Sequence, residues 1–469
     1  MMAANAGPTR ATRMSRLARS IAVVHILFLF FFLFFAPFAS AAETVDCHVG
    51  IYRMSDGRTV DIAHTDGDTL RWRRFDGSTG LLTRTADGLW ISTFGWTGRP
   101  DGKSARFSEC AEGRITFDGL VGHRLDLDVR ETTFTSHGVT LAGRLLIQKG
   151  SAAVPIVVLV HGAEHDSARD FNPLQRILPA EGVGSFVYDK RGTGASGGVY
   201  SQDFSLLADD AVAAMREAKR LAGSRTGRIG YQGGSQAGWV VPIAVNREHV
   251  DFSIVCFGLA VSVIDEDQQE VEIEMREKGH SPTEIAKALQ VASAAEAVFA
   301  SGFTDGFREF DAIRALYKDA PWYKDLHGNY THMFLPYSEA ELRAMATKFA
   351  WSTPFHYDPM PALRSDTTPQ LWILGTEDYE APSAETSYRI KSLIVDGRPF
   401  TLAVYPGAEH GMTLFETDPA SGERLSTHYP SGYFAMIRDF ARDSRLGGSY
   451  GDAVLTKSGD GRRKEPHIH

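Results

Sequence analysis

The chain has 469 residues, of which 43% are hydrophobic, and a formal net charge of -9 at pH 7. This length allows two or three domains with a large core. The acidic balance and the lack of a basic block argue against nucleic acid as a partner. None of the three cysteines belongs to a Cys-x-x-Cys pair and no His-Glu-x-x-His occurs, so the sequence predicts no metal and no cofactor.

Residues 1–42 have the layout of a secretory signal peptide. Four arginines precede the apolar run from Ile21 to Phe38, no acidic residue occurs before Glu43, and Ala39-Ser40-Ala41 fits a cleavage site. The alternative is an uncleaved membrane anchor, because the run approaches the ~20 residues that span a bilayer. The cleavage site favours removal, so we expect a periplasmic or secreted protein whose membrane contact is limited to this segment.

Residues 43–128 are predicted to form a small antiparallel β domain. Short alternating runs are separated by six Asp-Gly pairs, and Asp-Gly between alternating strands is a strong hairpin signal. Cys47 and Cys110 bracket the segment, and export implies an oxidising compartment, so we expect a disulfide between them. Cys256 lies in an apolar run and is expected to be a buried thiol. The aromatic residues are expected in the core, the alternative being a ligand-binding surface.

Residues 129–446 show strands that alternate with helices. Short continuous apolar runs predict strands buried on both faces, and they lie at 155–160, 184–188, 228–231, 250–257, 369–374 and 400–405. This alternation indicates an α/β fold with a mostly parallel, doubly wound sheet.

A helical insertion is predicted between the fourth and fifth of these strands, at about 262–354. Strand signals stop there, and helical patterns with many aromatic residues replace them. Insertions on such sheets occur near the carboxyl ends of strands, where ligands bind, so we expect a lid; the alternative is a plain packing layer. Residues 447–469 are rich in glycine, serine and charge and are expected to form a disordered tail.

Ser235 is the candidate nucleophile. It stands in Gly233-Gly-Ser-Gln-Ala-Gly238, between a predicted strand and a predicted helix, where a tight turn would expose its hydroxyl. The Gly-x-Ser-x-Gly pattern is met except that Ala237 replaces the second glycine. Taken alone the motif is weak, because Ser235 could simply cap a helix.

Two later strand ends supply partners for this serine. Asp378 follows the fifth apolar run and His410 follows the sixth. A serine nucleophile needs a base, and the base needs an orienting carboxylate. The chain order Ser, Asp, His is the order expected on a doubly wound hydrolase sheet.

Two backbone amides are candidates for an oxyanion hole. His161-Gly162-Ala163 follows the first apolar run, where such a fold draws one N–H donor, and Gln236 follows the serine and supplies the other. We predict Ala163 for the first position. Gly192-x-Gly-x-x-Gly197 matches a dinucleotide fingerprint, but the next helical pattern begins too late for a pyrophosphate site.

Together these segments resemble the α/β-hydrolase superfamily, and most of all bacterial exported esterases with a β-rich N-terminal domain. The resemblance covers about 129–445 and implies Ser235 as nucleophile, His410 as general base and acid, and Asp378 as the orienting carboxylate. It also implies hydrolysis of small-molecule carboxylic esters through an acyl-enzyme. The segments that carry it are His161-Gly162, Asp189–Gly197, Gly233–Gly238, Gly375–Asp378 and Glu409–Gly411.

Other functions remain open at this stage. The same triad could act on amides, peptides or thioesters, because the preference for a leaving group depends on pocket walls that the sequence does not place. A non-catalytic protein that binds an envelope component is a further alternative, against which the Ser, Asp and His set argues.

Overall fold

The structure is a computed structural model that describes residues 45–65, 67–348 and 352–457. All of these described residues belong to one compact unit. The segment predicted as a signal peptide, residues 1–42, lies outside the described residues. Within the described part, no helix has the length and hydropathy needed to cross a membrane.

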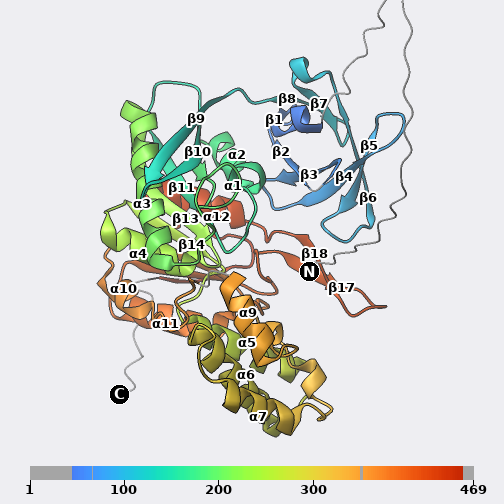
Figure 1. The fold of residues 1–469 in the computed structure, drawn as a ribbon. Coiled ribbons are helices and arrows are strands. Elements are labelled where there is room, and N and C mark those ends of the chain that lie inside the picture. Colours follow the sequence, from blue (N-terminus) through green and yellow to red (C-terminus); the bar gives the residue numbers. More distant parts are fainter. Residues whose placement is uncertain (1–44, 66, 349–351, 458–469) are drawn as a thin grey trace, which may run out of the picture. The chain divides into compact units, whose positions relative to one another are not determined.

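The first part of this unit is a closed antiparallel barrel, coloured blue to cyan in Figure 1. Each strand pairs with its neighbour in sequence, and the last strand closes on the first. The glycines of all six Asp-Gly pairs have positive φ. Five of them lie in turns between consecutive strands, as tight hairpins require, whereas Gly102 lies within β6, whose pairing with β5 shifts register. The strands are β1 (Gly50–Met54), β2 (Thr59–His64), β3 (Thr69–Arg74), β4 (Thr79–Arg84), β5 (Trp90–Phe94), β6 (Pro100–Phe107), β7 (Arg114–Phe117) and β8 (Leu120–Arg124).

Aromatic side chains fill the inside of this barrel. Tyr52, Trp72, Trp90 and Phe117 are all buried in one apolar cluster. The indole N–H of Trp72 donates to the hydroxyl of Ser92 at 2.8 Å, so its polar atom is satisfied inside the core. These aromatic residues therefore belong to the core and not to a ligand-binding surface.

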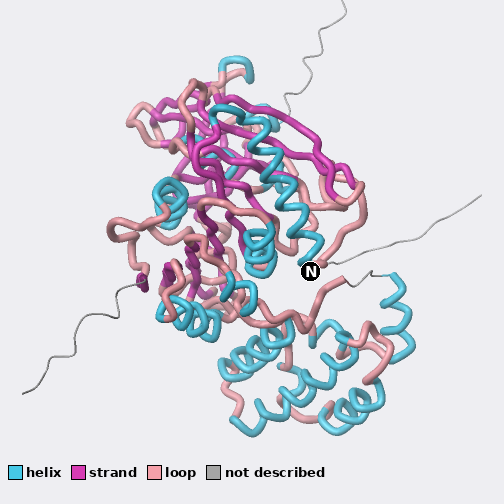
Figure 2. Tube along the Cα trace, turned by 90° about the vertical axis from the view of Figure 1, so that its left-hand side faces the viewer, coloured by secondary structure: helices cyan, strands magenta, loops and turns pink. Residues whose placement is uncertain are grey.

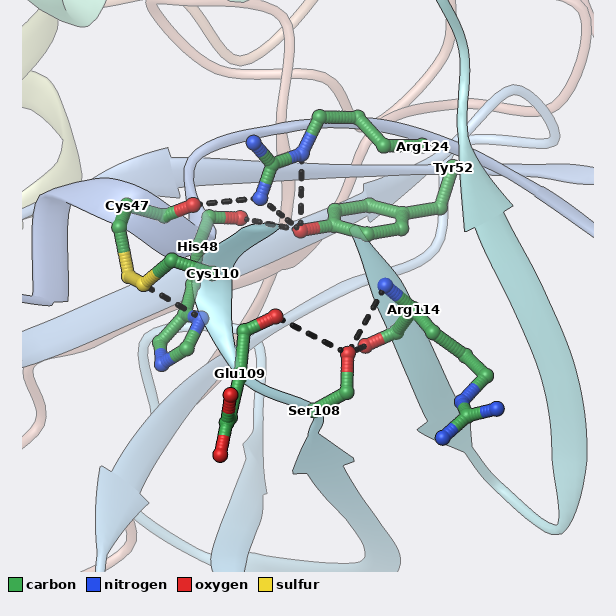
Figure 3. Close-up of a disulfide and its surroundings, with 8 residues drawn as sticks. All are labelled: Cys47, His48, Tyr52, Ser108, Glu109, Cys110, Arg114 and Arg124. Atoms are coloured by element: carbon green, nitrogen blue, oxygen red, sulfur yellow. Dashed lines mark hydrogen bonds between the residues drawn. A yellow bond between two sulfur atoms is a disulfide. The ribbon is translucent and has the colours of Figure 1, made fainter. Parts of the chain in front are cut away.

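The Cys47–Cys110 disulfide that the sequence predicts is present in the structure, and it joins two short 3-10 helices, Val45–His48 and Cys110–Glu112 (Figure 3). The side chains beside it are tied to the barrel. The hydroxyl of Tyr52 donates to the carbonyl of His48 at 2.8 Å, and the guanidinium of Arg124 donates to that hydroxyl at 3.0 Å. Cys256 is free and buried, as predicted.

The second part is a nine-stranded sheet with the order β19-β16-β15-β14-β13-β11-β12-β10-β9. The six strands β11 to β16 run parallel, whereas β9, β10 and β19 pair antiparallel with their neighbours. The bounds are β9 (Leu127–Ser136), β10 (Val139–Gln148), β11 (Val154–Val160), β12 (Gly184–Tyr188), β13 (Thr226–Gly234), β14 (Phe252–Cys256), β15 (Gln370–Gly375), β16 (Phe400–Tyr405) and β19 (Val454–Lys457).

Helices cover both faces of this sheet (Figures 1 and 2). Two buried apolar clusters, one on each face, explain why its central strands are apolar at almost every position. One cluster includes α3 (Phe204–Ala222), α4 (Ala237–Arg247) and α11 (Ser383–Val395), and the other includes α1 (Ala168–Phe171), α2 (Leu174–Ala180) and α12 (Tyr433–Asp443). This strand order and double winding confirm the predicted α/β-hydrolase fold.

The described residues between β14 and β15 form helices and loops (Figure 2). Ser262 and Ser281 begin the first two of these helices with complete capping boxes, which satisfy amides that a helix start leaves unpaired. The helices are α5 (Val263–Glu277), α6 (Pro282–Ala300), α7 (Phe307–Tyr317), α8 (Thr331–Phe334), α9 (Glu339–Lys348) and α10 (Met360–Ser365). A small hairpin, β17 (Leu414–Thr417) and β18 (Arg424–His428), follows β16.

The prediction of a disordered tail from residue 447 is wrong for its first part. Residues 454–457 form β19, which pairs antiparallel with β16 at the edge of the sheet. Without this strand, β16 would leave its backbone groups open at that edge. Ala453 and Leu455 also pack against the apolar cluster beneath. The glycine-rich composition hid this short strand, and residues 458–469 lie outside the described part.

Candidate active site

Ser235 occupies the turn between β13 and α4 with φ of +53°. A non-glycine residue in this left-handed region is strained, and such strain is typical of a nucleophile elbow. The amide of Ser235 donates to the carbonyl of Cys256 at 3.1 Å, and its carbonyl accepts from the amide of Gly238 at 2.7 Å. These two bonds hold the turn at the carboxyl end of the sheet.

The structure explains how this turn accommodates Ala237. A Cβ placed on Gly233 would lie 2.3 Å from the methyl carbon of Ala237, so the methyl fills space that Gly233 leaves open. A Cβ placed on Gly238 would lie 2.9 Å from the Cα of Gly258, which belongs to the loop after β14. The close approaches therefore require glycine at 233 and 238, and the small side chain of Ala237 fits between them.

The structure brings His410 and Asp378 together. His410 lies in the loop after β16, and its Nδ1 is 3.0 Å from Oδ1 and 3.2 Å from Oδ2 of Asp378, which follows β15. Asp378 is itself held in place, because its Oδ1 accepts from the amide of Ala381 at 2.8 Å. This contact would fix the ring orientation and leave Nε2 of His410 for proton transfer.

The ring of Phe257 lies between the Ser235 turn and His410 and contacts both. Its ring packs edge-on against the ring of His410, with 4.9 Å between centroids, and a Cβ on Gly234 would lie 2.2 Å from the same phenyl ring. The hydroxyl of Ser235 makes no hydrogen bond with any described residue, including His410. Such contacts are often long before substrate binds and tighten in the complex.

Carboxylates surround His410 and change its pKa. Burial alone would lower this pKa, but Asp378, Glu380 and Glu164 together raise it to about 9. Glu380 is the acid on the far side of the ring, with Oε1 3.6 Å from Nε2 of His410. These carboxylates therefore favour the imidazolium form of His410 at neutral pH.

The two predicted oxyanion amides lie in the loop after β11 and at the start of α4. Neither the amide of Ala163 nor that of Gln236 donates a hydrogen bond to another described residue. Nδ1 of His161 lies 3.2 Å from Oε2 of Glu164 within the same loop. Burial alone would raise the pKa of Glu164, but the contact with His161 lowers it to about 2.

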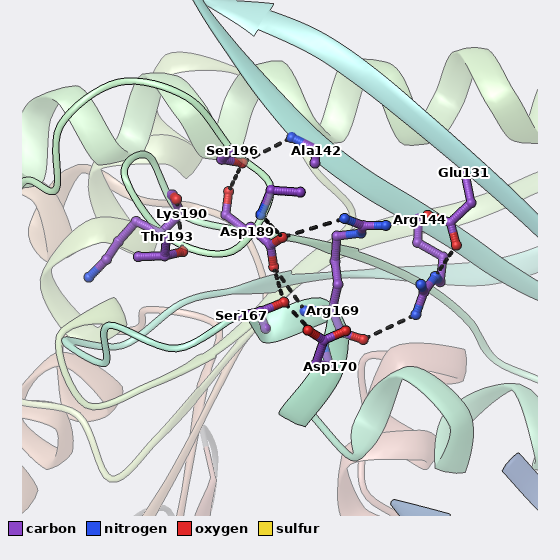
Figure 4. Close-up of polar contacts among 12 residues, drawn as sticks. Glu131, Ala142, Arg144, Ser167, Arg169, Asp170, Asp189, Lys190, Thr193 and Ser196 are labelled. Carbon is purple, nitrogen blue, oxygen red and sulfur yellow. Dashed lines mark hydrogen bonds and ion pairs between the residues drawn. The ribbon is translucent and has the colours of Figure 1, made fainter. Parts of the chain in front are cut away.

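The segment after β12 is hydrogen-bonded to the end of the loop that follows β11. The carboxylate of Asp189 accepts from the hydroxyl of Ser167 at 2.8 Å and from the amide of Ala195 at 3.0 Å (Figure 4). The glycine-rich 192–197 segment thus wraps around Asp189, and the next helix, α3, begins only at Phe204. This arrangement is consistent with the expectation that the segment is not a pyrophosphate site.

A pocket of about 260 Å³ lies beside these residues. Its wall includes Gly162 and Glu164 from the loop after β11, Gly234 from the turn, Phe257, and Gly411 from the loop of His410. Residues from four different strand ends therefore meet at one hollow, which is where ligands bind in open α/β sheets.

Two groups of side chains in the described residues have spacing that could hold a metal ion. In the first, Cys47 and Cys110 form the disulfide and are not free to bind metal. In the second, Glu274 already pairs with His327 at 3.4 Å and accepts from the amide of Gly328 at 3.3 Å.

Several residues around the site were missed by the sequence analysis. Glu380 lies two positions after Asp378, so a carboxylate near the triad could have been suspected. Lys190 stands in the Asp189–Gly197 segment that carries the resemblance, but nothing in the sequence names its partners. Phe257 and Tyr200 gave no signal, because an aromatic residue near a strand end is ordinarily part of the core.

No family model and no curated protein matches this chain. Among solved structures it is similar to an esterase of Pyrococcus furiosus at 14% identity, over 61% of this chain and 83% of that one, with a TM-score of 0.39. It is similar to an acylaminoacyl peptidase of Pyrococcus horikoshii at 15% identity, over 83% of this chain but 57% of the other, with a TM-score of 0.41. An esterase of Thermogutta terrifontis matches at 19% identity, over 60% and 91%, with a TM-score of 0.34. At such identities and TM-scores these likenesses carry no information about the chemistry of this chain.

Proposed function

We propose that this protein is a serine hydrolase that cleaves small-molecule carboxylic esters through an acyl-enzyme. The observation that carries the proposal is the strained Ser235 turn together with the His410–Asp378 contact at 3.0 Å. Strain at a non-glycine residue persists only where the surrounding structure enforces it, and it concentrates at functional sites.

The reaction follows from the roles of these side chains. Oγ of Ser235 attacks the ester carbonyl carbon while Nε2 of His410 accepts its proton, and Asp378 stabilises the imidazolium. The amides of Ala163 and Gln236 bind the oxyanion of the tetrahedral intermediate. Collapse releases the alcohol, which takes the proton from His410. Water then attacks the acyl-enzyme by the same sequence and releases the acid.

The test of this proposal is hydrolysis of activated esters by the wild type and by Ser235→Ala. We expect the variant to lose hydrolysis while its melting temperature stays close to that of the wild type. Persistent hydrolysis in Ser235→Ala would refute the assignment. A panel of esters, thioesters and peptide amides then separates an esterase from a thioesterase or a peptidase. A wild type that fails to react with a serine-directed phosphonate would favour a non-catalytic binding protein.

We further propose that the protein works in the periplasm or outside the cell and that α5–α9 act as a lid on the substrate. The disulfide supports an oxidising compartment. The insertion supports a lid because it follows β14, close to Phe257 and the Ser235 turn. The partner is a small-molecule ester, with no nucleic acid and no membrane contact beyond an uncleaved signal segment.

A further inference from the structure

Lys190 is a buried lysine whose contacts lie at the oxyanion amides. Its side chain leaves the Asp189 network and points away from it (Figure 4), and only 2% of the residue is exposed. Its Nζ donates to the carbonyl of Gly162 at 2.7 Å and lies 3.4 Å from Oε1 of Gln236. No carboxylate of the described residues lies within ion-pair distance of it, and Glu164 is the carboxylate whose charge acts on it from further away. A buried ammonium is costly unless its protons are bound, so what Nζ binds decides what this lysine does.

The first contact acts on the peptide that carries one oxyanion donor. The carbonyl of Gly162 and the N–H of Ala163 belong to the same planar peptide unit. A bond that fixes the carbonyl therefore also fixes the direction of the N–H on the opposite side. Because the donor is charged, the bond is strong, and it polarises the peptide so that its N–H becomes a better donor.

The second contact reaches the residue that carries the other donor. Lys190 touches the side chain of Gln236, whose own amide is the second oxyanion candidate. One ammonium thus contacts the peptide unit that carries one donor and the side chain of the residue that carries the other. The two donors come from the loop after β11 and from the start of α4.

Tyr200 acts on the next peptide of the same loop. Its hydroxyl donates to the carbonyl of Ala163 at 2.6 Å, and its ring lies 4.3 Å from Nζ of Lys190. The two side chains therefore hold consecutive carbonyls of the loop, while the aromatic face stabilises the ammonium. Burial is the cause that lowers the pKa of Lys190, to about 8.

We propose that Lys190 is a positioning residue of the oxyanion hole, which holds the Gly162–Ala163 peptide for transition-state binding. This inference rests on the proposed serine hydrolase function. It predicts that removing the ammonium weakens binding of the tetrahedral species much more than binding of the substrate, because the ground-state carbonyl depends less on these donors.

The test compares Lys190→Met with the wild type, using p-nitrophenyl butyrate as substrate and phenylboronic acid as inhibitor. The boronic acid forms a tetrahedral adduct with the hydroxyl of Ser235 and so resembles the tetrahedral intermediate. We expect kcat to fall about 10- to 100-fold, which is no more than the effect of removing one oxyanion donor. KM should stay within about 3-fold of the wild-type value. The inhibition constant of the boronic acid should rise by the same factor as kcat/KM falls. Butyrate, a ground-state ligand, should inhibit both proteins equally.

Two further variants keep the test decisive. Lys457→Met is the matched control, because Nζ of Lys457 also donates to a backbone carbonyl, that of Leu446 at 2.7 Å, but on the edge strand β19; its kinetics should equal those of the wild type. Tyr200→Phe removes the hydroxyl that holds the carbonyl of Ala163, and it should weaken kcat/KM and boronate binding in parallel. It carries the test if Lys190→Met fails to fold.

The outcomes separate this inference from the proposed function. If the wild type hydrolyses the ester and Lys190→Met matches it, or if boronate affinity stays constant while kcat falls, the inference on Lys190 is wrong. If the wild type hydrolyses no ester and Ser235 reacts with no phosphonate, the proposed function itself is wrong.

Discussion

Replacing Glu380 with glutamine should make the enzyme more active at neutral pH. Oε1 of Glu380 lies 3.6 Å from Nε2 of His410, and its side chain is 56% exposed. At this distance, with the dielectric constant of water, a carboxylate stabilises the imidazolium by about 1.2 kcal/mol. The water value is appropriate because an exposed ion pair is largely screened. Removing the charge favours the neutral form of His410, which is the base in the proposed reaction.

The size of the effect follows from this energy. Since about 1.4 kcal/mol corresponds to one pH unit, the midpoint of the acid limb of kcat/KM should move down by about 0.8. The pKa of His410 is about 9 in the wild type, so kcat/KM of the proposed reaction should rise with pH up to that value. At pH 7 the larger neutral fraction should raise kcat/KM of Glu380→Gln about 6-fold.

The assay is the pH dependence of kcat/KM for p-nitrophenyl butyrate at low ionic strength, repeated at about 1 M salt. High salt should shrink the difference between the proteins, because it screens exposed charges. Glu385→Gln is the control, since Glu385 pairs with Arg389 at 2.7 Å on α11 and does not contact His410. An acid limb with the same midpoint in Glu380→Gln and the wild type at low salt would refute the reasoning.

Three other predictions concern the triad, the elbow and the disulfide. Asp378→Asn should lower kcat about 10⁴-fold with an unchanged fold, because the imidazole loses its orienting carboxylate; near-normal kcat would contradict this. Gly233→Ala should destabilise the protein by about 1–3 kcal/mol in urea unfolding, because a Cβ there lies 2.3 Å from that of Ala237, and adding Ala237→Gly should restore part of the loss. Cys47→Ser should cost about 4 kcal/mol for a 63-residue separation, whereas an unchanged unfolding midpoint would show that the disulfide contributes nothing.

The sheet could be predicted from the sequence because its strands are buried on both faces. The run Pro155–Val160 contains no polar residue, which is typical of a central strand. Each apolar run is followed by a helical pattern or a glycine-rich turn. The edge strand β19 could not be recognised in this way. It is four residues long, Val454–Lys457, and it lies among glycines and charged residues. It is held by backbone pairing with β16, and backbone pairing produces no periodic pattern of apolar residues in the sequence.

The candidate site was predictable in its motifs and not in its surroundings. Ser235, Asp378 and His410 each follow a strand end, so the parallel sheet itself predicts that they meet at one edge. The contacts of Glu380 with His410 and of Lys190 with Gly162 join loops that are far apart in sequence. Both depend on how those loops fold, and a single glutamate or lysine in a loop carries no signal of its partner.

The measurement that tests the central proposal most directly is labelling of the folded protein with a fluorophosphonate, followed by peptide mapping and a parallel ester assay. The account predicts one adduct, on Ser235, with loss of hydrolysis in proportion to labelling, and no adduct in Ser235→Ala. Hydrolysis that survives full labelling, or an adduct that maps to another serine, would contradict it.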